Sequence, residues 1–67
     1  MMLEGVIAEV METWPLQLTL RNADGDHQVV LSETAVVRRA DGSAGDLSLL
    51  RSGEYVRIES NVVTVGH

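Results

Sequence analysis

Leucine alternates with polar residues from Leu16 to Arg21, and this period of two constrains the fold more than any other feature of the chain. Successive side chains of a β-strand point to opposite faces, so the alternation predicts a strand with one buried face. The dipeptide Asp24-Gly25 and a second apolar run, Gln28–Leu31, follow it. Asp-Gly between two such runs is a strong hairpin signal. We therefore predict a β-hairpin here.

The apolar positions also predict the register of this hairpin. With a turn at 24–25, or a four-residue loop around it, Leu20 lies opposite Val29. Leu18 then lies opposite Leu31, whereas a three-residue loop would scatter the apolar residues over both faces. Because a slip of one residue moves every side chain to the other face, this agreement supports the hairpin. The predicted core face consists of Leu16, Leu18, Leu20, Val29 and Leu31.

A second hairpin is predicted where Tyr55–Glu59 and Val62–Val65 flank a turn at 60–61. Its apolar residues also pair across the turn, which supports an even-numbered loop. The predicted pairs are Ile58 with Val63, Val56 with Val65, and Arg57 with Thr64.

Two more strands and one helical turn complete the pattern. Leu3–Met11 carries apolar residues on both faces, as expected of a long strand that bends around a small barrel, with Gly5 easing a bend or bulge. Ala35–Arg39 is a short strand before a second Asp-Gly turn at 41–42. The segment 46–53 breaks the period of two. Its predicted short helix or 3-10 turn would begin at Asp46 and end before Gly53.

In this turn Leu47 and Leu50 are three residues apart, so both are expected on one face that plugs an apolar space. Residues 1–67 are thus expected to form one all-β domain, a small five- to six-stranded OB-like barrel with one short helical turn before the last hairpin. Closure into a barrel is favoured because it removes exposed strand edges.

Composition excludes several classes of protein. The chain has 67 residues, no cysteine, ten acidic and five basic residues, and a net charge of -5. Disulfides and thiolate metal sites are therefore impossible, and the acidic balance argues against nucleic acid as a partner. No apolar run approaches the ~18 residues of a membrane span, so no membrane insertion is expected. Met1–Glu4 is too acidic for a signal peptide, which predicts a cytoplasmic location if this is the native full-length chain.

The order of motifs in the second half of the chain points to a family. A strand from Val36, the turn at 41–42, leucines at 47 and 50, and a strand Gly53–Ile58 follow one another. This succession resembles uncharacterised bacterial domains with OB-like small barrels, and Glu4–Val10 and the first hairpin are similar too. Glu54-Tyr55 departs from the pattern, which usually has Asp and a small residue there. The resemblance implies an OB-like fold, a binding or interaction role and no catalytic residues.

Four residues are the candidates for binding. Trp14, in the loop after the first strand, is the best anchor, since amphipathic aromatic side chains are enriched at interfaces. A tryptophan that caps the barrel end is the alternative. Tyr55, Arg38 and Arg39 are the other candidates, because stacking aromatics and local positive charge are what single-stranded nucleic acids require.

Two constellations suggest metals. His27 with Asp24 and Asp26 is one, and Met11 with Trp14 and His27 is a candidate copper(I) site. Zinc needs three or four ligands, and the 24–26 loop lacks the further oxygen ligands of a calcium loop. A single thioether is a poor copper(I) site. We expect no metal and no cofactor, and these residues define the alternative of a metal- or small-ligand-binding barrel.

No nucleophile is tied by spacing to a base, so we expect no enzyme. The expected function is a non-catalytic module that binds an unidentified protein partner or forms a homo-oligomer. Apolar and threonine side chains on the predicted outer faces would suit self-contact. They are Val62, Thr64, Val30 and Thr19. Single-stranded nucleic-acid binding is the weaker alternative.

Overall fold

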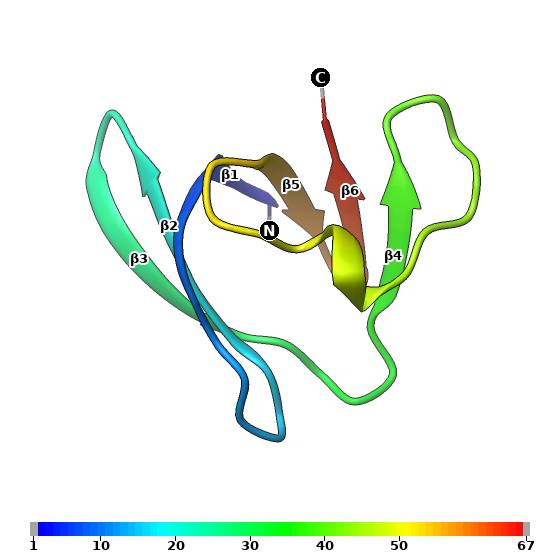
Figure 1. The fold of residues 1–67 in the computed structure, drawn as a ribbon. Helices are drawn as coiled ribbons and strands as arrows, with labels where there is room; N and C mark the ends of the chain where they lie inside the picture. Colours follow the sequence, from blue (N-terminus) through cyan, green and yellow to red (C-terminus); the bar gives the residue numbers. More distant parts are fainter. Residues whose placement is uncertain (1, 67) are drawn as a thin grey trace.

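The computed structural model describes residues 2–66, which form a six-stranded sheet and one 3-10 turn (Figure 1). The strands are β1 (Met2–Met11), β2 (Gln17–Asn22), β3 (Gly25–Val30), β4 (Val36–Arg39), β5 (Tyr55–Glu59) and β6 (Val62–Val65), and the turn is η1 (Leu47–Leu49). The order across the sheet is β3-β2-β1-β5-β6-β4. Every neighbouring pair is antiparallel except β4 and β6. The all-β prediction and the helical turn before the last hairpin are confirmed.

The sheet is strongly curved but remains open. Its outer strands are β3 and β4, and within residues 2–66 the strands do not close into the predicted barrel. Figure 1 shows the β2–β3 ribbon at one end, β6 and β4 at the other, and η1 in front of the sheet beside β4. No helix among the described residues is long and apolar enough to cross a bilayer.

Strand β1 joins the two halves of the sheet. Its N-terminal part pairs with β5, from Met2 opposite Glu59 to Val6 opposite Tyr55. Its C-terminal part pairs with β2, and the register shifts between Ile7 and Glu9. The bulge therefore lies at Ala8 rather than at Gly5. A bulge of this kind bends the strand, which lets β1 contribute to both halves.

Gly5 has a different structural role. A Cβ atom at this position would lie 2.7 Å from the Arg21 carbonyl oxygen. The two backbones approach each other more closely than any side chain permits, so the position requires glycine.

The first hairpin differs from its predicted register by two residues. Leu18 lies opposite Val29 and Leu20 lies opposite His27. The turn forms earlier because the Asn22 side-chain oxygen accepts a hydrogen bond from the Asp24 backbone N–H at 2.9 Å. Gly25, with φ 115, is consequently the first residue of β3 instead of a turn residue.

A shift of two leaves each side chain on its predicted face. Leu18, Leu20 and Leu31 are buried, and Leu16 and Val29 pack against the core. The second hairpin has the predicted register throughout, with Ser60 at φ 53 in its turn. The buried core consists of Ile7, Leu18, Leu20, Leu31, Val37, Leu50, Val56, Val63 and Val65.

The helical turn is shorter than predicted. Asp46 caps it as expected and accepts a hydrogen bond from the Ser48 backbone N–H at 2.9 Å. The turn is capped at its C-terminal end by Leu50, so Gly53 belongs to a separate turn, with φ 95. Leu50 is buried as predicted, whereas Leu47 is 45% exposed. The two leucines therefore do not share a buried face.

Candidate functional site

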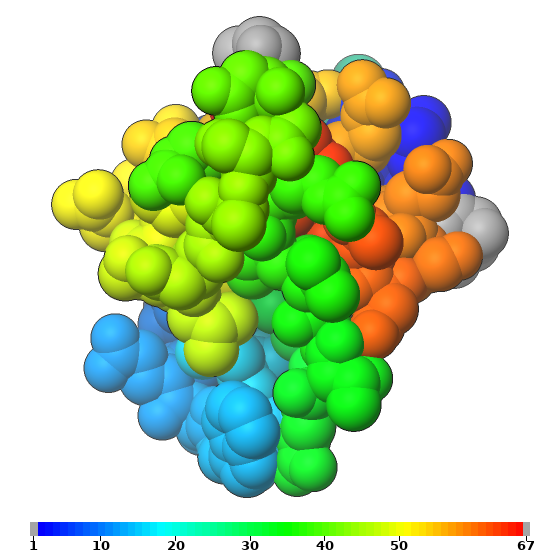
Figure 2. Space-filling model, turned by 90° about the vertical axis from the view of Figure 1, so that its right-hand side faces the viewer, coloured from blue at the N-terminus to red at the C-terminus, as the bar shows by residue number. Residues whose placement is uncertain are grey.

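A half-open groove of about 500 Å³ lies between the β1–β2 loop, β4 and the segment from β4 to η1. Figure 2 shows this face of the molecule, hollowed between the light-blue β1–β2 loop, the green segment before β4 and the yellow-green segment at η1. The apolar residues that line it are Trp14, Leu16, Leu31, Ala35, Val36, Val37, Ala44 and Leu47.

The groove has an apolar floor and apolar walls. Its floor includes the buried side chains of Leu31 and Val37, which belong to the core. Its walls carry three exposed side chains: Trp14 is 66% exposed, Val36 46% and Leu47 45%. Exposed apolar side chains that gather in one place mark a candidate interaction site, whereas single scattered ones need no explanation.

Local hydrogen bonds hold the loop that presents Trp14. The Thr13 hydroxyl donates to the Pro15 carbonyl at 2.9 Å, and the Trp14–Pro15 peptide bond is cis. Leu16 follows, with its carbonyl accepting from the Leu31 N–H at 2.9 Å. One hydrogen bond thus closes the loop internally, and the second ties its C-terminal end to the residue that follows β3.

Charged residues lie only at the exposed rim. They are Glu33, Arg38 and Asp46. The Ser48 hydroxyl and backbone N–H both donate to the Asp46 carboxylate, and these bonds hold its pKa below its usual range. Asp46 is therefore ionised at neutral pH, and two of the three charged rim residues are acidic.

The structure brings two of the four predicted binding residues together. Trp14 and Arg38 line the same groove. Arg39 instead donates from Nη1 to the Ala44 carbonyl at 2.6 Å and so fixes the loop after β4. Tyr55 lies in β5, where its hydroxyl donates to the Glu4 carboxylate. Arg39 and Tyr55 are therefore not part of the groove.

The contact between Tyr55 and Glu4 yields a pH prediction. Hydrogen bonding to Glu4, with desolvation and the nearby negative charge, raises the pKa of Tyr55 above the ordinary tyrosine value. The interaction that raises this pKa stabilises the fold below pH ~10, where the hydroxyl is protonated. This contribution to stability is lost as the pH rises through the folded-state pKa of Tyr55. We expect Glu4→Gln to lower the pKa of Tyr55.

Tyr55 is the only tyrosine, so tyrosinate absorbance measures this group alone. Glu9→Gln, also in β1, is the matched control and should leave the titration unchanged. An identical titration of wild type and Glu4→Gln would contradict the prediction.

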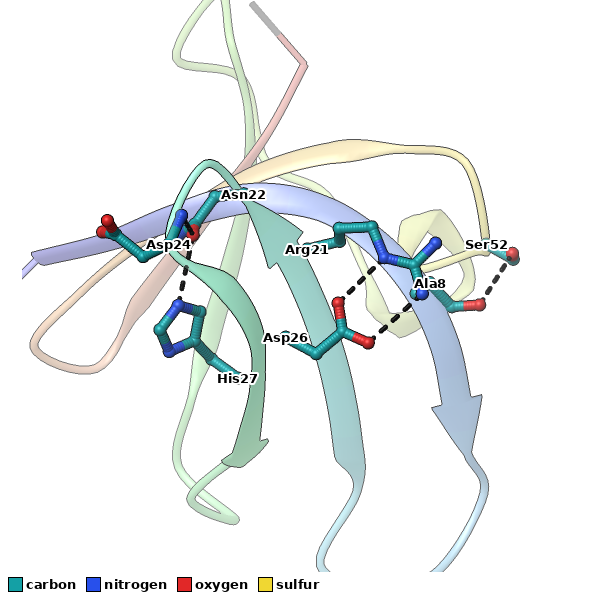
Figure 3. Close-up of polar contacts among 7 residues, drawn as sticks. All are labelled: Ala8, Arg21, Asn22, Asp24, Asp26, His27 and Ser52. Carbon is teal, nitrogen blue, oxygen red and sulfur yellow. Dashed lines mark hydrogen bonds and ion pairs between the residues drawn. The ribbon is translucent and has the colours of Figure 1, made fainter.

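The side chains of Asp24, Asp26 and His27, the first suggested metal site, point in different directions (Figure 3). Asp26 accepts two hydrogen bonds from Arg21, at 2.8 and 3.2 Å, on the outer face of the sheet. His27 Nε2 lies 3.1 Å from the Asn22 side-chain oxygen, and His27 pairs with the inward-facing Leu20. Within residues 2–66, no three His, Cys, Asp or Glu side chains gather at metal-binding distance.

Met11 and His27 lie on opposite faces of the sheet. Met11 pairs with Gln17 at the far end of the β2–β3 ribbon, and its sulfur accepts from Gln28 Nε2 at 3.9 Å. Gln28 lies on the outer face, whereas His27 lies on the inner one. The side chains of the suggested copper(I) site therefore do not converge.

Sequence reasoning missed the residues that complete the groove. Val36 and Leu47 were assigned to a strand and to a buried helical face, yet both are groove walls. The available signal is the charged N-cap Asp46, which lies at the groove rim directly before Leu47. In comparisons with other proteins, no protein family, no curated protein and no solved structure matched the chain.

Proposed function

We propose that this protein is a non-catalytic interaction module that binds an apolar side chain of a partner protein in the Trp14 groove. One observation carries the proposal: Trp14, Val36 and Leu47 stand exposed around an apolar floor. Binding hot spots are apolar or aromatic anchors in a pocket of this kind, surrounded by a polar rim.

The distribution of polar groups favours a protein over a polar small molecule. Small-molecule sites combine an apolar pocket with a few inward polar groups that fix the orientation of the ligand. In residues 2–66 no buried polar or charged residue is present, and the polar groove residues lie at the rim. Such a surface suits an apolar side chain whose own main chain remains at the rim.

Charge favours a partner segment with basic residues beside the apolar one. The chain has a net charge of -5, and Glu33 and Asp46 outnumber Arg38 at the rim. Opposite charge accelerates association, and like charge suppresses it. The same charge disfavours single-stranded nucleic acid, whose phosphates require a positive groove.

We also propose that the fold is an incompletely closed OB-like barrel. Three strands in a meander, β1-β2-β3, followed by the β5–β6 hairpin beside β1 support it. In OB-folds the loop between the first two strands belongs to the binding region. Here that loop carries Trp14, in agreement with the groove as the binding site.

Selection from a random peptide library on the immobilised protein tests the function. We expect selected peptides to carry apolar residues flanked by basic ones and to change the fluorescence of Trp14, the only tryptophan. Val36→Asp should weaken them about tenfold or more, because it places a charge in the apolar wall.

Val6→Asp is the matched control. Val6 is also in a strand and is 42% exposed, against 46% for Val36, but it lies outside the groove. Peptides that bind Val36→Asp as tightly as wild type would refute the proposed site. Failure to select any apolar peptide would refute the function.

A further inference from the structure

The two outer strands of the sheet differ in how their free edges are treated. The outer edge of β4 is covered by the loop that follows it. The Arg39 N–H donates to the Ser43 carbonyl at 2.9 Å, and the Gly45 N–H donates to the Val37 carbonyl at 3.0 Å. The chain thereby satisfies the backbone groups of one end of its own sheet.

Strand β3 has no such cover among the described residues, where its one strand neighbour is β2. The Leu31 N–H donates to the Leu16 carbonyl at 2.9 Å. This bond shows which residues of β3 direct their backbone N–H and C=O groups toward β2. Hydrogen-bonded and non-bonded pairs alternate in an antiparallel ladder. Residues 25, 27 and 29 therefore face β2, and the backbones of Asp26, Gln28 and Val30 face outward.

This edge also lacks the usual protection against strand pairing. Exposed edges are normally blocked by lysine, proline, a bulge or a covering loop. Strand β3 contains no lysine or proline, and its register with β2 is continuous. The charge of Asp26 is engaged by Arg21 of its own sheet, as Figure 3 shows, and Val30 is 58% exposed.

We propose that β3 pairs with β3 of a second copy of this chain, antiparallel and around a two-fold axis at Gln28. The edge is complementary to itself in this register. Gln28 lies opposite Gln28 of the second copy, and Asp26 lies opposite Val30 of the second copy. The three outward-facing residues each have one N–H and one C=O, so both copies satisfy all of these groups in one continuous twelve-stranded sheet.

Charge disfavours one of the neighbouring registers. Moving the axis to Asp26 would place two carboxylates directly opposite each other, which is unfavourable. The contact involves one short strand per copy and falls below the standard interface size, so the dimer is weak. Each copy has a net charge of -5, and salt screens this repulsion.

Sedimentation over a range of protein concentrations at physiological ionic strength tests the proposal. We expect the average mass to rise from the monomer toward the dimer. Gln28→Lys, which places two like charges at the axis, should weaken dimerisation about tenfold or more. Gln17→Lys is the matched control, because both variants lose the same hydrogen bond between Gln28 Nε2 and Gln17 Oε1 at 3.0 Å.

Amide hydrogen exchange identifies the contact directly. The N–H groups of Asp26, Gln28 and Val30 should exchange more slowly at high protein concentration, whereas those of His27 and Val29 are already protected by β2. A monomer at every concentration overturns the proposal. So does a dimer that leaves these three amides unprotected, or one that Gln17→Lys weakens as much as Gln28→Lys.

Discussion

Leu18→Ala is expected to lower the free energy of unfolding by about 2–5 kcal/mol. Leu18 is fully buried and lies in β2 at the centre of the core, between Val10 of β1 and Val29 of β3. A domain of 67 residues has a total stability of about 3–10 kcal/mol. This one substitution therefore removes a large part of the stability, which urea unfolding followed by circular dichroism measures.

Leu47→Ala is the control for this measurement. It removes the same atoms from a side chain that is 45% exposed, so we expect a loss of about 1 kcal/mol or less. Equal losses at the two positions would mean that Leu18 does not lie in the core.

Gly5→Ala is expected to destabilise the protein by about 1–3 kcal/mol, even though it adds only one methyl group. The new Cβ would lie 2.7 Å from the Arg21 carbonyl oxygen, an atom of the backbone beside β1. Relief of this contact requires β1 and β2 to separate. The gain from a less flexible unfolded chain, about 0.4–1 kcal/mol, offsets only part of the loss.

Gly45→Ala separates this effect from glycine replacement in general. A Cβ at Gly45 would also meet a close neighbour, at 2.6 Å, but that neighbour is the Leu49 Cδ1 methyl group. The end of a leucine side chain can rotate away, so we expect a loss below about 1 kcal/mol. A larger loss at Gly45 than at Gly5 would contradict this explanation. Urea unfolding of both variants provides the comparison.

The sequence predicted the faces of the strands better than their pairing. In the second hairpin the apolar pairs define one register, and Ile58 lies opposite Val63 as predicted. In the first hairpin two registers place the same leucines inside, so hydrophobic patterning cannot separate them. The Asn22 side chain favours the observed register, because it accepts a hydrogen bond from the Asp24 backbone N–H. The turn therefore lies at residues 23–24 instead of 24–25. Such a local hydrogen bond is not visible in a period-two pattern.

The groove was predictable only in part. Trp14 beside Pro15 is recognisable as an exposed anchor, and Arg38, also predicted, lines the same groove. The parallel pairing of β4 with β6 positions Val36 in the groove that Trp14 also lines, and pairing between distant strands leaves no local signal in the sequence. Leu47 was misplaced because a helical face was assumed for a turn of only three residues.

The position of β1 sets the order in which the sheet can be completed. The β2–β3 ribbon follows β1 directly in the chain and can pair with it through local contacts. The other edge of β1 pairs with β5, and Met2 lies opposite Glu59, a residue distant from it in sequence. Contacts so distant in sequence slow folding. The joining of β5 to β1 is therefore expected to be a late step of folding.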